Sequence, residues 1–325
     1  MRILILGGTR FLGRTTAAEA VSRGHDVTCA ARGQAGPTPD GARLVKVDRD
    51  APDGLTPLAG EHFDAVVDVS PISYPWVRRA LDAFGTAAHW TFVSSISAYA
   101  HPDRLDDVLL PPRQEHADRS VVMKDPDAYG SIKVASENAV LDTAADRALI
   151  IRAGLITGPA DEHDRFGYWA NRLSRGGQVV VPDTDLPMQI IDVGDLATWI
   201  IDAAERGTTG VYDGIGPAQP LLDLLGEVAA AVGPSAELVR VPESVLLEHE
   251  VGYWSGPRSL PLWLPDTHRN MGNRDAGPAM AAGFSPRPIG EAATRALAHE
   301  RELGLDRERK AGLPAEVEQE ILAKL

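Results

Sequence analysis

The chain has 325 residues, of which 44% are hydrophobic and 24% charged. This composition is ordinary for a folded globular protein and excludes a wholly disordered one. The net charge of −14 argues against a broad nucleic-acid-binding or membrane-binding surface, because both need basic residues. The single cysteine, Cys29, cannot form an internal disulfide, and no apolar run approaches the roughly 20 residues that span a bilayer. We therefore expect a soluble, cytoplasmic protein of two or three structural units.

The first half of the chain alternates short apolar runs with helical patterns. The predicted buried strands, rich in Val, Ile and Leu, are residues 3–6, 27–30, 44–47, 65–69, 90–93 and 149–152. The predicted helices between them are residues 11–23, 75–84 and 129–142. Strands that are apolar on both faces and alternate with helices predict an α/β fold, a doubly wound parallel sheet of the Rossmann type.

The second half has a looser rhythm with proline-rich stretches between its helices. Its predicted helices are residues 166–174, 193–204, 221–232, 290–302 and 314–324. We expect a dinucleotide-binding domain formed by residues 1–152 and 189–213. A smaller, mostly helical substrate-binding lobe would take residues 153–188 and 214–325.

A glycine-bearing loop joins the first strand to the first helix. Backbone amides at the positive end of a helix bind a pyrophosphate, and Gly7 and Gly13 would supply the tight turn and the close packing of the helix on the strand. An ordinary strand-to-helix turn can carry the same glycines, but a position after the first strand of an alternating chain favours a dinucleotide site. The candidate cofactor-binding residues of this loop are Gly7, Thr9, Arg10, Phe11, Leu12 and Gly13.

The end of the second strand bears on the choice of cofactor. An acidic residue there would bind the ribose 2′-hydroxyl of NAD, but this chain has Arg32 and no acid. Arg32, with Arg10, could pair with a 2′-phosphate, which predicts NADP(H) with NAD(H) as the alternative. Asp48 is a candidate acceptor for the adenine amino group. Two further candidate cofactor contacts, Val69 and Ser70, stand at the end of the fourth strand.

Tyr129 and Lys133 stand four residues apart, and therefore on one face of a helix. A phenol with a pKa near 10 is a poor base at neutral pH, and a nearby ammonium lowers that pKa. The same lysine could hold the nicotinamide ribose. Three serines, Ser94, Ser95 and Ser97, follow the fifth strand at the sheet edge where ligands bind, and compete to donate a hydrogen bond to a substrate carbonyl oxygen.

Together these segments resemble the extended short-chain dehydrogenase/reductases, which include nucleotide-sugar epimerases and dehydratases. Residues 152–159 and 191–197 also match, so the resemblance spans about the first 200 residues. It implies that Tyr129 is the acid/base, that Lys133 lowers its pKa, and that Ser95, four residues before Tyr99, is the carbonyl donor. It also implies a homodimer through helices 75–84 and 129–142. The Gly-Gly-Thr-Arg-Phe loop resembles an atypical branch that also contains chloroplast RNA-associated proteins.

Two positions depart from the family's pattern. Leu155 stands where nucleotide-sugar members usually carry Asn, and Met188 where they commonly carry a basic residue. Phosphates need cationic or amide donors, so these departures favour a small, uncharged, non-nucleotide substrate. The candidate substrate contacts are Ile96, Ser97, Leu155, Trp169 and Met188, although large aromatic side chains usually belong to the core.

The sequence thus predicts an NADP(H)-dependent oxidoreductase acting on a carbonyl or secondary alcohol of a small molecule. One alternative is an epimerase or dehydratase of a sugar or nucleotide-sugar that uses the same three side chains. Another is a non-catalytic dinucleotide sensor or RNA-associated protein. The acidic segment 161–164 has no second histidine at metal-site spacing, so we expect no metal. The negative net charge leads us to expect neither nucleic acid nor membrane as a partner.

Overall fold

The computed structural model describes residues 1–69 and 72–325, so the predicted cofactor contact Ser70 lies outside the described residues. Its centre is a seven-stranded sheet in the order β11-β6-β5-β4-β1-β2-β3, with all neighbours parallel. The strands are β1 (Arg2–Leu6), β2 (Asp26–Ala31), β3 (Arg43–Lys46), β4 (Ala65–Asp68), β5 (His89–Ser95), β6 (Ala148–Ala153) and β11 (Gly210–Gly214). The predicted doubly wound α/β fold is confirmed.

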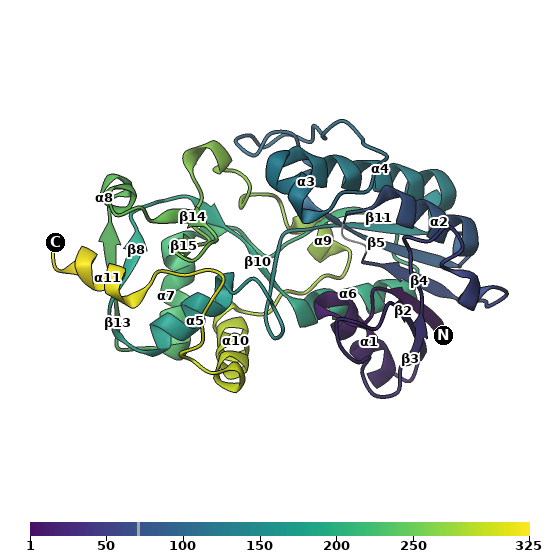
Figure 1. Cartoon of the computed structure of the whole chain (residues 1–325), viewed down its shortest axis with the longest axis horizontal. Coiled ribbons are helices and arrows are strands. Elements are labelled where there is room, and N and C mark those ends of the chain that lie inside the picture. The colour runs from purple at the N-terminus through teal and green to yellow at the C-terminus, as the bar shows by residue number, and fades with distance from the viewer. Residues whose placement is uncertain (70–71) are drawn as a thin grey trace.

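Helices cover both faces of this sheet, which explains why its strands are apolar without alternation (Figure 1). Side chains of a strand point alternately to opposite faces. Ile3 and Ile5 accordingly pack in one apolar cluster with α1 and α6, whereas Leu4 and Leu6 pack in another with α2 and α4. The four helices are α1 (Phe11–Ser22), α2 (Tyr74–Phe84), α4 (Asp127–Ala144) and α6 (Val193–Arg206).

The remaining chain builds a second lobe, drawn on the left of Figure 1, around its own apolar core. Its helices are α5 (Arg165–Ser174), α7 (Leu221–Val232), α8 (Glu243–Glu248), α10 (Ile289–Leu303) and α11 (Ala315–Leu322). Two-stranded pairs accompany them: β7 (Leu155–Thr157) with β10 (Ile190–Asp192), β8 (Gly177–Pro182) with β13 (Ala236–Val241), β9 (Pro187–Met188) with β12 (Gln219–Pro220), and β14 (Gly252–Trp254) with β15 (Ser259–Pro261). Besides the expected helices, the lobe therefore contains four small sheets.

Two segments link the lobe to the sheet domain. After β10, helix α6 packs against α1, and β11 completes the main sheet beside β6. Further along, α9 (Gly277–Ala281) returns to the sheet domain, where Phe284 packs on Trp199 at 5.2 Å between ring centroids. The short helix α3 (Arg119–Lys124) precedes α4. Across the described residues, no helix is both long and apolar enough to cross a membrane.

Candidate active site

The loop between β1 and α1 is packed too tightly for side chains at its glycines. Gly7 has φ +102°, and a Cβ built on it would stand 2.8 Å from Val69 Cγ2. A Cβ on Gly13 would stand only 2.3 Å from the Gly7 carbonyl oxygen. Both glycines therefore allow the first turn of α1 to lie directly against the end of β1. This arrangement is the cradle that a dinucleotide pyrophosphate requires, so the residues present fit such a cofactor.

The other predicted cofactor residues differ in exposure. Thr9 and Leu12 are buried, Phe11 and Val69 are half-buried, and Arg10, Arg32 and Asp48 are exposed. The carboxylate of Asp48 accepts a hydrogen bond from the backbone of Asp50 at 3.1 Å. The guanidinium of Arg10 binds the carboxylate of Glu162, with Nε donating at 2.5 Å. It is therefore engaged elsewhere and does not join Arg32 in a site for a 2′-phosphate.

The three predicted catalytic side chains come together at the carboxyl end of β5. Ser95 is the last residue of that strand, and Tyr129 and Lys133 lie in the first turns of α4. Ser95 hydrogen-bonds the Tyr129 hydroxyl. The Lys133 ammonium donates to the Val93 carbonyl at 2.8 Å and lies 5.8 Å from the centroid of the Tyr129 ring. A hydroxyl, a phenol and an ammonium thus face one place.

Burial perturbs both titratable groups of this trio. It raises the pKa of Tyr129, and the hydrogen bond from Ser95 and the charge of Arg165 oppose that rise. Burial also lowers the pKa of Lys133 to about 8, although the charges of Asp68 and Glu137 act in the opposite direction. The side-chain amine of Lys133 is therefore mostly protonated at neutral pH.

Asp68 and Glu137 were missed by sequence reasoning. Arg49 binds the buried carboxylate of Asp68 through two hydrogen bonds of 3.0 and 2.9 Å. Arg152 binds the buried carboxylate of Glu137 at 2.7 Å. Only the spacing of Glu137, four residues after Lys133 on the same helix, could have drawn attention to it. Both pairs stabilise the structure around Lys133, because removing one partner of such a buried ion pair is strongly destabilising.

A cavity of about 240 Å³ lies beside Ser95 and Tyr129. Four of the predicted substrate residues line it: Ile96, Ser97, Leu155 and Met188. The fifth, Trp169, is fully buried in the core of the lobe and donates from its indole to the Pro261 carbonyl at 2.7 Å. It is not among the residues that line the cavity, and its position fits the usual role of a large aromatic side chain.

Sequence reasoning missed two polar lining residues, Arg165 and Gln189, and the lining also includes Trp254. Arg165 is the first residue of α5, and its guanidinium carbon lies 4.8 Å from the centroid of the Trp254 ring. Gln189 donates to the carbonyls of Gly216 and Arg274 at 2.7 and 2.8 Å. The signal for Arg165 in the sequence is its position directly after the acidic segment 161–164.

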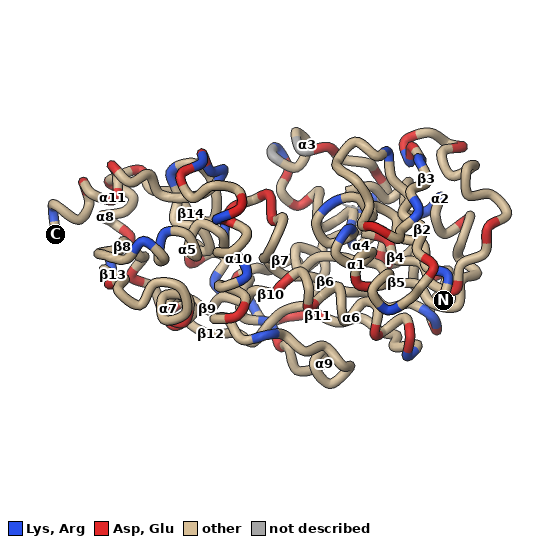
Figure 2. Tube along the Cα trace, turned by 90° about the horizontal axis from the view of Figure 1, so that it is seen from below, with Lys and Arg blue, Asp and Glu red and all other residues tan. Residues whose placement is uncertain are grey.

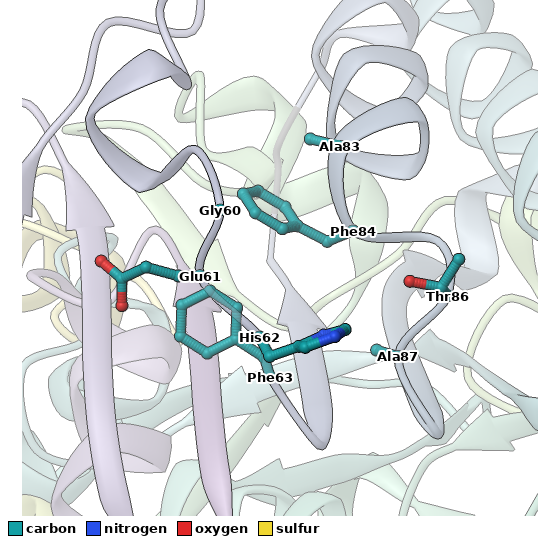
Figure 3. A pocket seen from close by; sticks show the side chains of 8 residues that line it. All are labelled: Gly60, Glu61, His62, Phe63, Ala83, Phe84, Thr86 and Ala87. Carbon is teal, nitrogen blue, oxygen red and sulfur yellow. The ribbon is translucent and has the colours of Figure 1, made fainter.

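A second cavity, of about 200 Å³, lies at the amino-terminal end of the strands, where β4 and β5 begin (Figure 3). Phe63 and Phe84 meet there edge to face at 5.7 Å. Ligands of doubly wound sheets bind outside the carboxyl ends of the strands, so this cavity is on the wrong side for the chemistry described here.

The fold, the glycine cradle and the Ser-Tyr-Lys trio have the arrangement expected of the short-chain dehydrogenase/reductase class. The chain belongs to the NAD dependent epimerase/dehydratase family, whose model matches residues 3–213. The predicted family resemblance is thereby confirmed.

The solved structures that resemble this chain share its fold at low sequence identity. One is the UDP-glucuronic acid 4-epimerase of Bacillus cereus in complex with NAD, with 16% identity, a TM-score of 0.63, and coverage of 93% of this chain and 99% of that one. Another is the UDP-glucose 4-epimerase of Thermotoga maritima with UDP-glucose, with 15% identity, a TM-score of 0.63 and the same coverage.

Among curated proteins, the chain resembles the chloroplast stem-loop binding protein of 41 kDa b of Arabidopsis thaliana. The two are 26% identical over 261 residues, which is 73% of this chain and 65% of the relative. The match therefore spans slightly less than two thirds of the relative's length.

Proposed function

We propose that this protein is an NAD-dependent epimerase or dehydratase acting on a secondary alcohol of a sugar or nucleotide-sugar. The observation that carries the proposal is the convergence of Ser95, Tyr129 and Lys133 beside a cavity at the carboxyl end of β5. Family membership supports internal redox chemistry over the net reduction that the sequence suggested first. The substrates printed for the structural neighbours, UDP-sugars, indicate which compounds to test first.

Each member of the trio has a distinct task in this proposal. A dinucleotide held at the loop of Gly7 and Gly13 would accept a hydride from the substrate carbon and return it. Tyr129 removes the proton of the substrate hydroxyl as the alcohol is oxidised and returns it when the carbonyl is reduced. Ser95 donates a hydrogen bond to the same substrate oxygen and holds it next to the phenol. The charge of Arg165 favours the phenolate form of Tyr129. We assign the same effect to Lys133, whose ammonium lies 5.8 Å from the centroid of the Tyr129 ring.

For the cofactor we propose NAD first and NADP as the alternative. NAD is the cofactor printed for the Bacillus cereus epimerase. The absence of an acid at the end of β2 and the exposed guanidinium of Arg32 support NADP. Titration calorimetry with both dinucleotides distinguishes them, because Arg32→Ala weakens binding of NADP alone if the guanidinium contacts a 2′-phosphate.

The test is incubation of the NAD-loaded protein with UDP-glucose, UDP-glucuronic acid and UDP-N-acetylglucosamine. An epimerase or dehydratase converts one of them to a product resolved by chromatography and NMR. Because hydride is returned to the substrate, no lasting change develops at the nicotinamide absorbance band. Conversion that consumes the dinucleotide stoichiometrically would contradict the proposal.

A carbonyl reductase with the same trio is the second candidate. The observation that favours it is the apolar character of the cavity at Leu155 and Met188, which offer no donor to a diphosphate. Stoichiometric oxidation of NADPH with small carbonyl compounds, and no conversion of UDP-sugars, would establish this candidate instead.

An RNA-associated role is motivated by the name of the Arabidopsis relative. Figure 2 shows basic and acidic residues interspersed along the chain, and the net charge of −14 opposes binding of the polyanionic backbone of RNA. Retention of stem-loop RNA at physiological salt, without turnover of any sugar, would favour that role.

Two further proposals, a cytoplasmic location and a homodimer through α2 and α4, are tested by cell fractionation and light scattering.

A further inference from the structure

The cavity beside Tyr129 has an unusual distribution of charge. Fourteen residues line it, and among those the structure describes, Arg165 is the only one with a charged side chain. The others are apolar or neutral, such as Leu155, Met188 and Gln189. A guanidinium in such surroundings raises the question of which anion it is meant to bind, because buried charges are normally paired.

The hydrogen-bonding capacity of Arg165 is not used within the described protein. Its Nε is buried without a hydrogen-bond partner. Asp161 is the carboxylate whose charge acts most on the guanidinium, yet no hydrogen bond joins the two among the described residues. Asp161 does not line the cavity, and its own Oδ2 is also buried without a partner. Buried polar groups that lack partners are rare and call for an explanation, and a ligand that completes them is one.

The position of Arg165 is fixed by a strained neighbour. Trp254 adopts φ +62°, a left-handed conformation that bulky residues rarely occupy, and its backbone is held by a hydrogen bond to the Trp263 carbonyl at 2.9 Å. In that position its ring stacks on the guanidinium at 4.8 Å. Strained backbone persists where the surrounding structure requires it and clusters at ligand-binding sites. The stack leaves the planar fork of Arg165 available to a planar anion.

We propose that Arg165 binds a carboxylate carried by the substrate close to the alcohol that is oxidised, so that the enzyme acts on a uronate rather than a neutral sugar. This inference rests on the proposed function and narrows its substrate class. The two groups of the substrate must be close to each other, because Arg165 and Tyr129 line the same cavity of about 240 Å³. A cavity of about 240 Å³ accommodates a sugar-sized group and not a whole nucleotide, so the anion held here belongs to the reacting part.

The test is titration calorimetry on the NAD-loaded protein with two probes, UDP-glucuronic acid and UDP-glucose. These probes differ only in bearing a carboxylate or a hydroxymethyl group on the sugar. The wild type should bind the first at least about tenfold more tightly, as expected for a charge-assisted, bidentate pair. Arg165→Met should abolish the preference, and Arg165→Lys, which keeps the charge without the fork, should retain part of it.

Arg175→Met is the matched control, because this arginine directly follows α5 and contacts Asp306 and the Leu305 carbonyl outside the cavity. It should keep the wild-type preference. Equal affinity of the wild type for both probes, or a preference that survives Arg165→Met, overturns the inference and leaves the proposed function standing. Failure of both probes to bind overturns the nucleotide-sugar part of the proposed function and this inference with it.

Discussion

Replacing Gly13 by Ala tests the glycine cradle. In an open helix this substitution stabilises, because Ala is favoured over Gly by about 1 kcal/mol. At Gly13, however, the new Cβ would stand 2.3 Å from the Gly7 carbonyl oxygen and 3.1 Å from Val69 Cγ2. The first of these distances is about 0.7 Å shorter than the 3.0 Å that Cβ contacts need, and the atom that must yield is backbone.

Overpacking of this kind costs about 1–3 kcal/mol, so the net effect of Gly13→Ala is a loss of up to about 2 kcal/mol after the gain in helix propensity. Gly226→Ala in α7 is the matched control, since nothing lies within 4 Å of its Cβ position. It should gain up to about 1 kcal/mol.

Thermal unfolding measures both variants, and titration calorimetry measures their affinity for NAD. Gly13→Ala should unfold at a lower temperature and bind NAD more weakly, because α1 must move away from the end of β1. Gly226→Ala should unfold at a slightly higher temperature with unchanged affinity. If Gly13→Ala matched Gly226→Ala in both measurements, the cradle would play no part in cofactor binding.

Three further predictions concern charged groups. Glu162→Gln should release Arg10 from its ion pair and raise the affinity for the dinucleotide by up to about fivefold, the range of an exposed ion pair. The control Glu320→Gln should leave the affinity unchanged. Weaker binding by Glu162→Gln in titration calorimetry would contradict this role of Arg10. Arg165→Met should raise the pKa of Tyr129 further and move the acidic limb of kcat/KM for alcohol oxidation to higher pH. The control Arg175→Met should leave this pH profile unchanged. An unchanged profile for Arg165→Met would refute the effect of the Arg165 charge on Tyr129. Lys133 has a pKa of about 8 in the fold against 10.5 ordinarily, so between these values the unfolded chain holds a proton that the folded protein has released. Stability of the wild type relative to Lys133→Met should therefore rise from about pH 8 to about pH 10 in urea unfolding, and a constant difference would show that this lysine is not desolvated.

The sheet domain could be predicted from sequence because its signals are local. Strands such as β1 and β6 contain continuous apolar runs, and the loop at Gly7 and Gly13 has a spacing dictated by backbone geometry. Element boundaries were predicted to within two residues, as for α4, expected at 129–142 and found at Asp127–Ala144. The division of the chain into residues 1–152 with 189–213, and 153–188 with 214–325, remains a prediction.

The lobe could be predicted less well because its signals are short or depend on distant parts of the chain. Strand pairs of two or three residues, such as β9 with β12, are too short to show a period. Arg165 and Trp254 are 89 positions apart, and only the folded lobe brings their side chains together. The same limit explains Trp169, where composition suggested a substrate contact but packing of α5 turned the ring into the core.

The most direct test of the account is turnover by Tyr129→Phe, measured with whichever UDP-sugar the wild type converts. Loss of the phenolic hydroxyl should lower kcat by 10²–10⁴-fold, the usual contribution of general acid–base catalysis, while calorimetry finds the affinity for NAD unchanged. A variant that turns over at close to the wild-type rate would contradict the assignment of proton transfer to this residue.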